Sequence, residues 1–300
     1  MSTEEGEVAG VRLTHPDKVL YPDQGLTKRR LAEYLAGVAR HMLPFAKRHP
    51  LSLVRCPDGI GDKCFFQKHL TASMPRSFKT VSIREKDGGK ADYLYVEDVA
   101  GIVAAAQIGA LELHVWGASN DDLEHPDRLV FDLDPDDSVP FAEVKAAAGD
   151  LRSVLDAAGL RTFPMITGGK GIHVIAPLSG RNDWDEVKTF AAGLARGFAD
   201  RDPGRFVATA SKARRKGRIF IDWLRNERGA TAILPYSPRA RKGAPVAVPV
   251  AWSELSRLRS AAAFDTVAVL KRLTGPKRDP WPDYRKRQHI GKETLDTVAS

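Results

Sequence analysis

Short apolar runs that alternate with longer helix-like segments constrain the fold of this chain most. The runs LSLVRC, DYLYV, LELHVW, RLVFDLD, GIHVIAPL and RIFIDWL have the length and composition of β-strands. Apolar residues at helical spacing predict helices at 25–45, with Thr27 as N-cap, and at 141–158, 184–198 and 252–259. Because the strands and helices interleave along the chain, the pattern indicates an α/β or α+β fold.

The charge distribution favours a polyanionic partner. The chain has 300 residues and a formal net charge of +8. Residues 201–300 contain 22 Lys and Arg against 9 Asp and Glu, so residues 1–200 carry the balancing net charge of −5. A basic third joined to a mildly acidic remainder is typical of nucleic-acid-binding proteins. A solvated basic face without a partner is the alternative, and charge alone does not choose between them.

Several classes of protein are disfavoured by what the sequence lacks. The sequence has no run of about 18 apolar residues and therefore does not predict a membrane span. The acidic leader MSTEEGEVAG has no apolar core and is expected to be disordered rather than a signal peptide, which points to the cytoplasm. Two cysteines are too few for a secreted disulfide scaffold. The spacing of Cys56, Cys64 and His69 fits no standard zinc site.

Two carboxylates lie inside the strand-like run RLVFDLDP. Asp132 and Asp134 are two residues apart, so in a strand both face one side, with Val130, while the remaining apolar residues face the other. Such carboxylates repel unless a multivalent cation lies between them. A third carboxylate, Asp222, ends the run RIFID, and oxygen ligands of this kind suit Mg²⁺ or Mn²⁺. An acidic turn that ends the strand is an equally good explanation of the first pair.

The glycine-rich segment TGGKGIHVIAP joins two predicted strands. Its glycines let a backbone approach a ligand closely, and exposed N–H groups with Lys170 suit phosphate binding. A Walker A loop is excluded because its spacing is absent and a strand follows. His173 alternates with Ile172 and Val174 and therefore lies on the opposite face of that strand. Taken alone, this segment is more often a hairpin turn than a triphosphate site.

The order FDLDP, TGGKGIHV, RIFIDWLRN resembles the three-motif layout of archaeo-eukaryotic primase-type polymerases, most closely the polymerase domain of bacterial DNA ligase D. The segments LTHPDKVLYPDQGLTKRRLAEYL and TAILPYSPRARKGAPVAVPVAW are also similar to that family. The resemblance implies a primase-polymerase fold over 11–290. It places an N-terminal α/β lobe that binds a DNA 5′-phosphate at roughly 11–120, and a catalytic lobe with an RRM-like sheet at roughly 121–290.

The resemblance also implies roles for individual residues. The metal ligands for two Mn²⁺ or Mg²⁺ ions, which are also the catalytic residues, are Asp132, Asp134 and Asp222. The nucleotide-contacting residues are His114, Thr167, Lys170, His173 and Arg239. The residues that contact the 5′-phosphate or the template are Lys18, Lys28, Arg55, Phe65 and Phe66, with one Phe stacked on a template base. Thr167 departs from the family's usual Ser but keeps the hydroxyl.

The implied activity is a template-directed nucleotidyltransferase that fills gaps and extends ends in bacterial non-homologous end joining, with a preference for ribonucleotides. The implied partners are DNA ends, gapped duplex with a 5′-phosphate, NTP or dNTP, Ku and an ATP-dependent ligase, in the cytoplasm at the nucleoid. Alternatives are a stand-alone gap-filling polymerase of base-excision repair and a non-catalytic DNA-end-binding module. A ligase or end-processing nuclease is disfavoured, because no K-x-D-G motif and no His-rich phosphoesterase site is present.

Overall fold

The computed structural model describes residues 6–85, 87–275 and 279–299. Its contacts divide the chain into two compact units, and the chain enters each of them three times. Unit 1 consists of Met1–Asp121, Ile233–Ala247 and Phe264–Lys277, and unit 2 of Asp122–Ala232, Val248–Ala263 and Arg278–Ser300. The lobes expected from the sequence were continuous, whereas these units are not. The function expected of each lobe stays a prediction.

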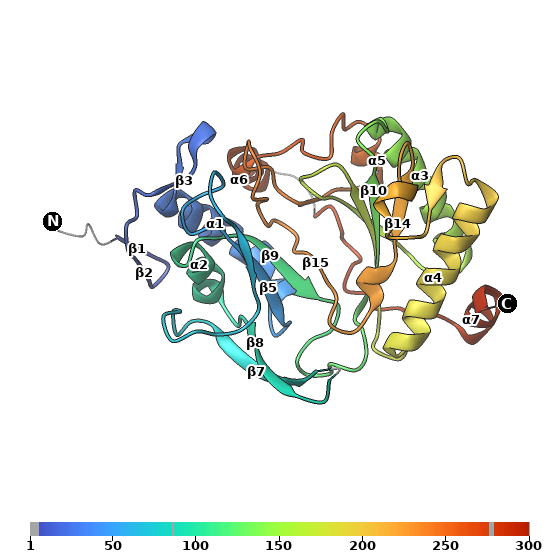
Figure 1. Cartoon of the computed structure of the whole chain (residues 1–300), viewed down its shortest axis with the longest axis horizontal. Helices are drawn as coiled ribbons and strands as arrows, with labels where there is room; N and C mark the ends of the chain where they lie inside the picture. The colour runs from blue at the N-terminus through green and yellow to red at the C-terminus, as the bar shows by residue number, and fades with distance from the viewer. Residues whose placement is uncertain (1–5, 86, 276–278, 300) are drawn as a thin grey trace. The chain divides into compact units, whose positions relative to one another are not determined.

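Unit 1 is a mixed α/β structure that contains the blue and cyan elements of Figure 1. Its elements are β1 (Gly6–Val8), β2 (Val11–Leu13), β3 (Val19–Tyr21), η1 (Pro22–Gln24), β4 (Leu26–Thr27), α1 (Lys28–Ala46), β5 (Leu51–Arg55), β6 (Phe65–Gln67), β7 (Lys79–Arg84), β8 (Lys90–Tyr95), α2 (Val99–Gln107), β9 (Ala110–Trp116) and α6 (Thr266–Thr274). β5 pairs antiparallel with β6 and β9, and β7 pairs with β8. The β1–β2 hairpin was not expected, because β1 belongs to the leader, residues 1–10, that was predicted to be disordered, and β2 follows that leader directly; residues 1–5 lie outside the described part.

Helix α1 forms where the sequence predicts it. The Thr27 hydroxyl accepts a hydrogen bond from the backbone N–H of Arg30 at 3.3 Å, which caps the helix. The apolar positions of the predicted stripe, including Leu31, Leu35 and Met42, are completely buried. They form the face by which α1 packs against its neighbours, among them α2 and α6.

A disulfide joins Cys56 and Cys64, which the sequence did not lead us to expect. It closes the loop between β5 and β6, and the same loop donates a hydrogen bond from the Ile60 N–H to the Leu20 carbonyl at 2.9 Å. His69, the third residue of the weak zinc pattern, instead binds the Asp92 carbonyl oxygen through Nδ1 at 3.0 Å. The cysteines therefore fix the loop that precedes Phe65 and Phe66 rather than a metal.

Unit 2 contains the elements labelled β10, β14, α3, α4, α5 and α7 in Figure 1. Its elements are β10 (Arg128–Pro135), α3 (Phe141–Ala157), β11 (Phe163–Ile166), β12 (Ile172–Pro177), α4 (Trp184–Arg201), β13 (Phe206–Val207), η2 (Lys212–Arg214), β14 (Ile219–Asp222), η3 (Leu224–Asn226), β16 (Val248–Pro249), α5 (Trp252–Leu255) and α7 (Lys292–Ala299). Along β15 (Thr231–Ile233) the chain passes back into unit 1. The strands form a six-stranded sheet in the order β13-β14-β10-β12-β11-β16, which places β10 between β14 and β12.

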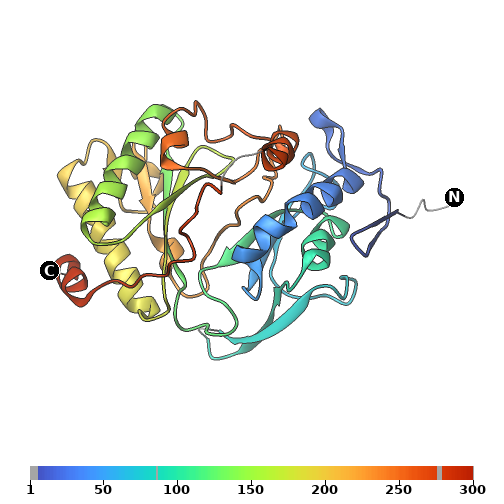
Figure 2. The same cartoon turned by 180° about the vertical axis from the view of Figure 1, so that it is seen from behind.

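Helices α3 and α4 cover one face of this sheet in both Figure 1 and Figure 2. The predicted alternation in β10 holds: Leu129, Phe131 and Leu133 are completely buried, and the two carboxylates lie on the other face. α4 begins with a capping box formed by Asp183 and Glu186. Helix α5 ends at Leu255 and is shorter than the predicted 252–259.

The fold class expected from the sequence is confirmed, since both units combine strands and helices. Within residues 6–85, 87–275 and 279–299, no helix is long and apolar enough to cross a membrane.

Candidate active site

Three polar side chains form a row across three adjacent strands of unit 2. The antiparallel register pairs Asp132 of β10 with His173 of β12 on one side and with Asp222 of β14 on the other. His173 Nε2 lies 3.4 Å from Asp132 Oδ1. The motifs FDLDP, GIHV and RIFID, which are far apart in the sequence, therefore meet at one level of the sheet. The alternation of residues had predicted each face, but the register comes from the structure.

Two arginines compensate the charges of the carboxylates. Arg225 Nη2 lies 3.1 Å from Asp132 Oδ2 and 3.1 Å from Asp222 Oδ2. Arg215 Nη1 donates a hydrogen bond to Asp134 Oδ2 at 2.8 Å. Guanidinium groups thus balance these carboxylates pairwise in the structure, and the expected multivalent cation stays a prediction.

The row holds its two carboxyl groups in opposite electrostatic states. Burial by itself raises the pKa of Asp132, but the neighbouring His173 and the Arg225 guanidinium hold that pKa well below its usual range. Burial also raises the pKa of Asp222; Arg225 opposes the shift and the charge of Asp132 adds to it. The pKa of Asp132 therefore lies below its usual range and that of Asp222 above it, and a further cation beside Asp222 would oppose the rise.

The carboxylates have the donor chemistry of a site for hard divalent cations. Within the described part of the chain, no group of three or more His, Cys, Asp or Glu side chains is already gathered as a metal site. However, oxygens of Asp132 and Asp222 converge on a single nitrogen of Arg225. Asp134 lies on the same face of β10 and is half-exposed, with 52% of its side chain accessible. Such oxygen donors fit Mg²⁺ or Mn²⁺, provided that the arginine swings away.

The glycine-rich turn lies beside the row. The Thr167 hydroxyl donates to the Gly171 carbonyl at 3.0 Å and accepts from the Gly169 N–H at 3.3 Å, which holds the turn closed. Lys170 is exposed and forms an ion pair with Asp137. A Cβ atom at Gly171 would lie 2.4 Å from the Leu133 carbonyl oxygen, so only glycine lets the turn pass this close to β10.

A buried amide holds β10 just before its carboxylates. The Asn226 side chain is 1% exposed; its Oδ1 accepts from the Val130 N–H and its Nδ2 donates to the Val130 carbonyl, both at 2.7 Å. The amide thus replaces a neighbouring strand at the point where β14 has ended at Asp222. Asp132 follows two residues later and is positioned by this pairing.

His114 and Arg239, the other two nucleotide-contacting residues expected from the resemblance, belong to unit 1 and share one buried carboxylate there. Glu112 Oε2 lies 2.8 Å from His114 Nε2, and Glu112 Oε1 lies 3.1 Å from Arg239 Nε. The Ala240 N–H also donates to Glu112 Oε1 at 2.9 Å. Sequence reasoning did not single out Glu112, although it precedes His114 by two residues on one strand and so shares its face.

The ionisation of Glu112 gives a prediction about pH. Burial alone raises the pKa of Glu112, but the hydrogen bond from His114 and the charge of Arg239 lower it to about 2. A lowered pKa stabilises the fold above the unfolded-state value of about 4.3, and this contribution is lost as the pH falls toward 2. We expect a loss on the order of 3 kcal/mol between these limits in urea unfolding, and a flatter profile in Glu112→Gln. Equal slopes in the two proteins would contradict the assignment.

The residues expected to contact DNA gather in two places of unit 1. Lys28 is 7% exposed and its Nζ donates to the Thr14 carbonyl at 2.7 Å. Burial lowers the pKa of Lys28, and the nearby charge of Lys18 lowers it further. Lys18 Nζ lies 2.5 Å from Asp58 Oδ1. Two close lysines, one of them buried, favour an anion beside them.

The second group lies around the β5–β6 pair. Arg55 donates from Nε to the Ile108 carbonyl at 2.9 Å and lies over the Phe65 ring at 5.3 Å. Phe66 is 72% exposed and meets the His114 ring edge-on at 6.3 Å between centroids. An aromatic side chain this exposed is suited to stacking on a ligand ring.

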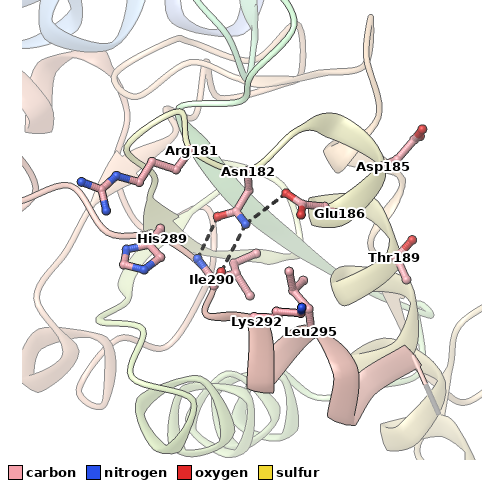
Figure 3. Close-up of a pocket in the computed structure, with 9 residues that line it drawn as sticks. All are labelled: Arg181, Asn182, Asp185, Glu186, Thr189, His289, Ile290, Lys292 and Leu295. Carbon is pink, nitrogen blue, oxygen red and sulfur yellow. Dashed lines mark hydrogen bonds between the residues drawn. The ribbon is translucent and has the colours of Figure 1, made fainter.

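Unit 2 also contains a cavity of about 550 Å³, which Figure 3 shows from the side of α4 and α7. Asn182 lies at its centre, accepting from the Ile290 N–H at 2.8 Å and donating to the Ile290 carbonyl and to Glu186 Oε2, each at 3.2 Å. It follows the end of β12, where Pro177 pairs with Arg128, the residue of β10 farthest from the carboxylates. This amide anchors the C-terminal segment.

Comparison with known proteins identifies the fold. The family model described as LigD, primase-polymerase domain, matches residues 27–281. The chain belongs to this family. The solved polymerase domain of ligase D from Mycobacterium tuberculosis, determined in complex with DNA, superposes with a TM-score of 0.81 at 34% identity. That match covers 88% of this chain and 94% of the solved one.

Curated LigD proteins give the same result. The multifunctional non-homologous end joining protein LigD of Pseudomonas aeruginosa is 41% identical over 285 residues, which cover 94% of this chain and 34% of that protein. The LigD protein of Mycolicibacterium smegmatis is 34% identical over 248 residues, 82% of this chain and 32% of its own length. The chain thus spans about a third of the length of these LigD relatives.

The two arginines that balance the carboxylates of this LigD primase-polymerase domain were not predicted from the sequence. Arg225 had a signal, because it lies three residues after Asp222 within the motif RIFIDWLRN. Arg215 had none, since it pairs with Asp134 across 81 residues of sequence.

Proposed function

We propose that this chain is a template-directed nucleotidyltransferase that fills gaps and extends DNA ends in bacterial non-homologous end joining. The observation that carries the proposal is the row of Asp222, Asp132 and His173 on a LigD primase-polymerase sheet. The lowered pKa of Asp132 and the raised pKa of Asp222, beside each other in this row, add support for a functional site.

The carboxylates of unit 2 would hold two divalent ions, Mn²⁺ or Mg²⁺, through Asp132, Asp134 and Asp222. Such ions, when bound, activate an attacking hydroxyl and stabilise a leaving pyrophosphate. The protein's part is to keep Asp132 ionised, to supply oxygen ligands on one face of β10, and to release Arg225 from between them.

The substrate would be an NTP or dNTP, with ribonucleotides preferred. The primer 3′-hydroxyl attacks the α-phosphate of the bound nucleotide, the new phosphodiester forms and pyrophosphate leaves. Cationic groups on exposed or mobile side chains suit the triphosphate, and hydroxyl and imidazole groups suit the sugar. The proposed contacts are Thr167, Lys170, His173, His114 and Arg239.

Unit 1 would grip the DNA. The close pair Lys18 and Lys28 suits a 5′-phosphate, since an anion beside the pair would favour the charged form of the buried Lys28 and oppose the lowering of its pKa. Phe66 would stack on a template base, with Phe65 and Arg55 shaping the strand beneath it.

The proposed setting is DNA end joining in the cytoplasm, at the nucleoid, together with Ku and an ATP-dependent ligase. Ligation itself would be carried out by a partner, or by a region of the kind that the LigD relatives have outside the third of their length that matches this chain. A role in base-excision repair is not favoured, because the relatives are end-joining proteins.

Primer extension tests the proposal directly. The chain is incubated with a gapped duplex that carries a 5′-phosphate, with Mn²⁺ or Mg²⁺, and with either NTP or dNTP. We expect templated addition that is fastest with NTP and Mn²⁺. Binding of the gapped duplex without addition of any nucleotide under all four conditions would instead support a DNA-end-binding module.

The lysine pair gives a second measurement. Lys28→Met keeps the aliphatic stem but removes the charge, so the preference for a 5′-phosphate over a 5′-hydroxyl gap should fall by about 10-fold or more. Extension on the 5′-hydroxyl gap should stay unchanged. Lys47→Met, an exposed lysine just beyond the same helix, serves as the matched control. An unchanged phosphate preference in Lys28→Met would contradict the proposed pocket.

A further inference from the structure

Glu112 is the buried acidic residue of unit 1 to which the proposed activity gives no role. It lies on β9, where the register pairs it with Val54, and His114, two residues on, pairs with Ser52. Its side chain is 9% exposed. A buried carboxylate costs stability unless its oxygens take part in hydrogen bonds or ion pairs, so the partners of Glu112 indicate what it does.

Each oxygen of Glu112 lies within ion-pair distance of a side chain expected to contact the nucleotide. Oε2 faces His114 Nε2 at 2.8 Å, and Oε1 faces Arg239 Nε at 3.1 Å. The carboxylate thus joins His114 on the strand to Arg239 in a loop, 125 positions away in the sequence. The segment around Arg239 is also held through its backbone, since the Tyr21 hydroxyl donates to the Arg239 carbonyl at 3.0 Å.

The carboxylate is suited to orient both groups. An ionised acceptor at Nε2 selects the form of the His114 ring that carries a proton on that nitrogen. The ion pair with Oε1 at 3.1 Å holds the Nε edge of the Arg239 guanidinium beside the carboxylate and so restricts the plane of its remaining N–H groups. The low pKa of Glu112, about 2, keeps this acceptor charged at any physiological pH.

We propose that Glu112 is a positioning residue for the nucleotide: it sets the ring orientation and protonated nitrogen of His114 and the plane of the Arg239 guanidinium. This inference rests on the proposed function, because the two residues it orients are taken to contact the nucleotide. Glu112 itself does not act on the reacting atoms. The charged and titratable groups around it are His114, Arg239 and Tyr21.

The main test is Glu112→Gln in the full chain, with nucleotide binding and steady-state extension measured. The amide keeps the size of the side chain but presents an N–H to one of its two partners. We expect the KM for NTP to rise by about 10- to 100-fold, with kcat changing much less. Removing the negative charge of Glu112 would by itself tighten the binding of an anionic nucleotide. Weaker binding would therefore indicate that His114 and Arg239 have lost their orientation. Tighter or unchanged binding would overturn the proposal.

Controls separate positioning from general destabilisation. All variants are compared at a temperature where circular dichroism shows them folded. Glu97→Gln neutralises another partly buried carboxylate of unit 1, which pairs with Arg48 at 3.4 Å, and should leave the KM unchanged. In His114→Ala and Arg239→Ala backgrounds, the effect of Glu112→Gln should shrink, because the groups it orients are gone. Additive effects in both double variants would show that Glu112 has only a structural role.

A spectroscopic measurement separates this inference from the proposed function. Nitrogen NMR of histidine-labelled protein reports which ring nitrogen of His114 carries the proton. We expect the Nε2–H form in the native chain and a shift toward the other tautomer in Glu112→Gln, whether or not the chain polymerises nucleotides. If the native chain proves inactive but the ring responds, only the function fails. If the chain is active and the ring does not respond, only the positioning role fails.

Discussion

Asp132→Asn should reduce the rate of nucleotide addition by on the order of 1,000-fold or more. Asp132 is the centre of the row, within hydrogen-bonding or ion-pair distance of both His173 and Arg225. The substitution keeps the shape of the side chain and removes the charge that a divalent cation requires. Asp222 lies in register beside it on β14, so the two carboxylates would bind the cation together.

The effect should also be visible without turnover. Binding of Mn²⁺, followed by electron paramagnetic resonance, should weaken strongly in Asp132→Asn. Asp156→Asn, which neutralises an exposed carboxylate on α3 that pairs with Arg152 at 3.3 Å, is the matched control and should behave as the native chain. Native-like addition by Asp132→Asn would remove the carboxylate row from the mechanism altogether.

Asn226→Ala should destabilise the chain by about 3–5 kcal/mol, since it leaves the N–H and C=O of Val130 buried without their partners. Chemical unfolding measures this loss. The rate of nucleotide addition should fall as well, even where the variant is folded, because the freed segment of β10 carries Asp132 two residues later. The substitution is therefore expected to lower both the stability of the fold and the rate of nucleotide addition.

A second buried amide provides the comparison. Asn182 bonds to the N–H and C=O of Ile290 much as Asn226 does to Val130, but it anchors the C-terminal segment (Figure 3). Asn182→Ala should lose stability for the same reason while leaving the rate per folded molecule unchanged. Equal rates in the two variants would mean that Asn226 does not position the catalytic strand.

Much of the frame could be predicted from the sequence, because it depends on local patterns. The helical stripe with Thr27 as its cap gave α1, and the alternation in RLVFDLDP gave both faces of β10. The family resemblance gave the fold class that the comparisons confirm. The roles that the resemblance implies for individual residues stay predictions, which the variants described above would test.

What the sequence could not supply are pairings that depend on tertiary structure. Arg215 reaches Asp134 and Glu112 reaches Arg239 across long stretches of chain, and a charge in a sequence does not state its partner. Asn226 looked like the end of a motif, yet its amide serves as a strand neighbour. The disulfide could not be predicted either, because a count of two cysteines does not state whether the loop brings them close together in space.

The interrupted path of the chain means that unit 1 cannot be obtained as an N-terminal fragment. A protein truncated after residue 121 would lack the Tyr236 carbonyl that accepts from the Tyr34 hydroxyl at 2.8 Å and the Ser237 hydroxyl that accepts from the Leu113 N–H at 2.8 Å. It would also lose Arg239, leaving the Glu112 carboxylate with an unbalanced charge. Separate study of the two units therefore calls for point substitutions or for a permuted chain, not for halves expressed separately.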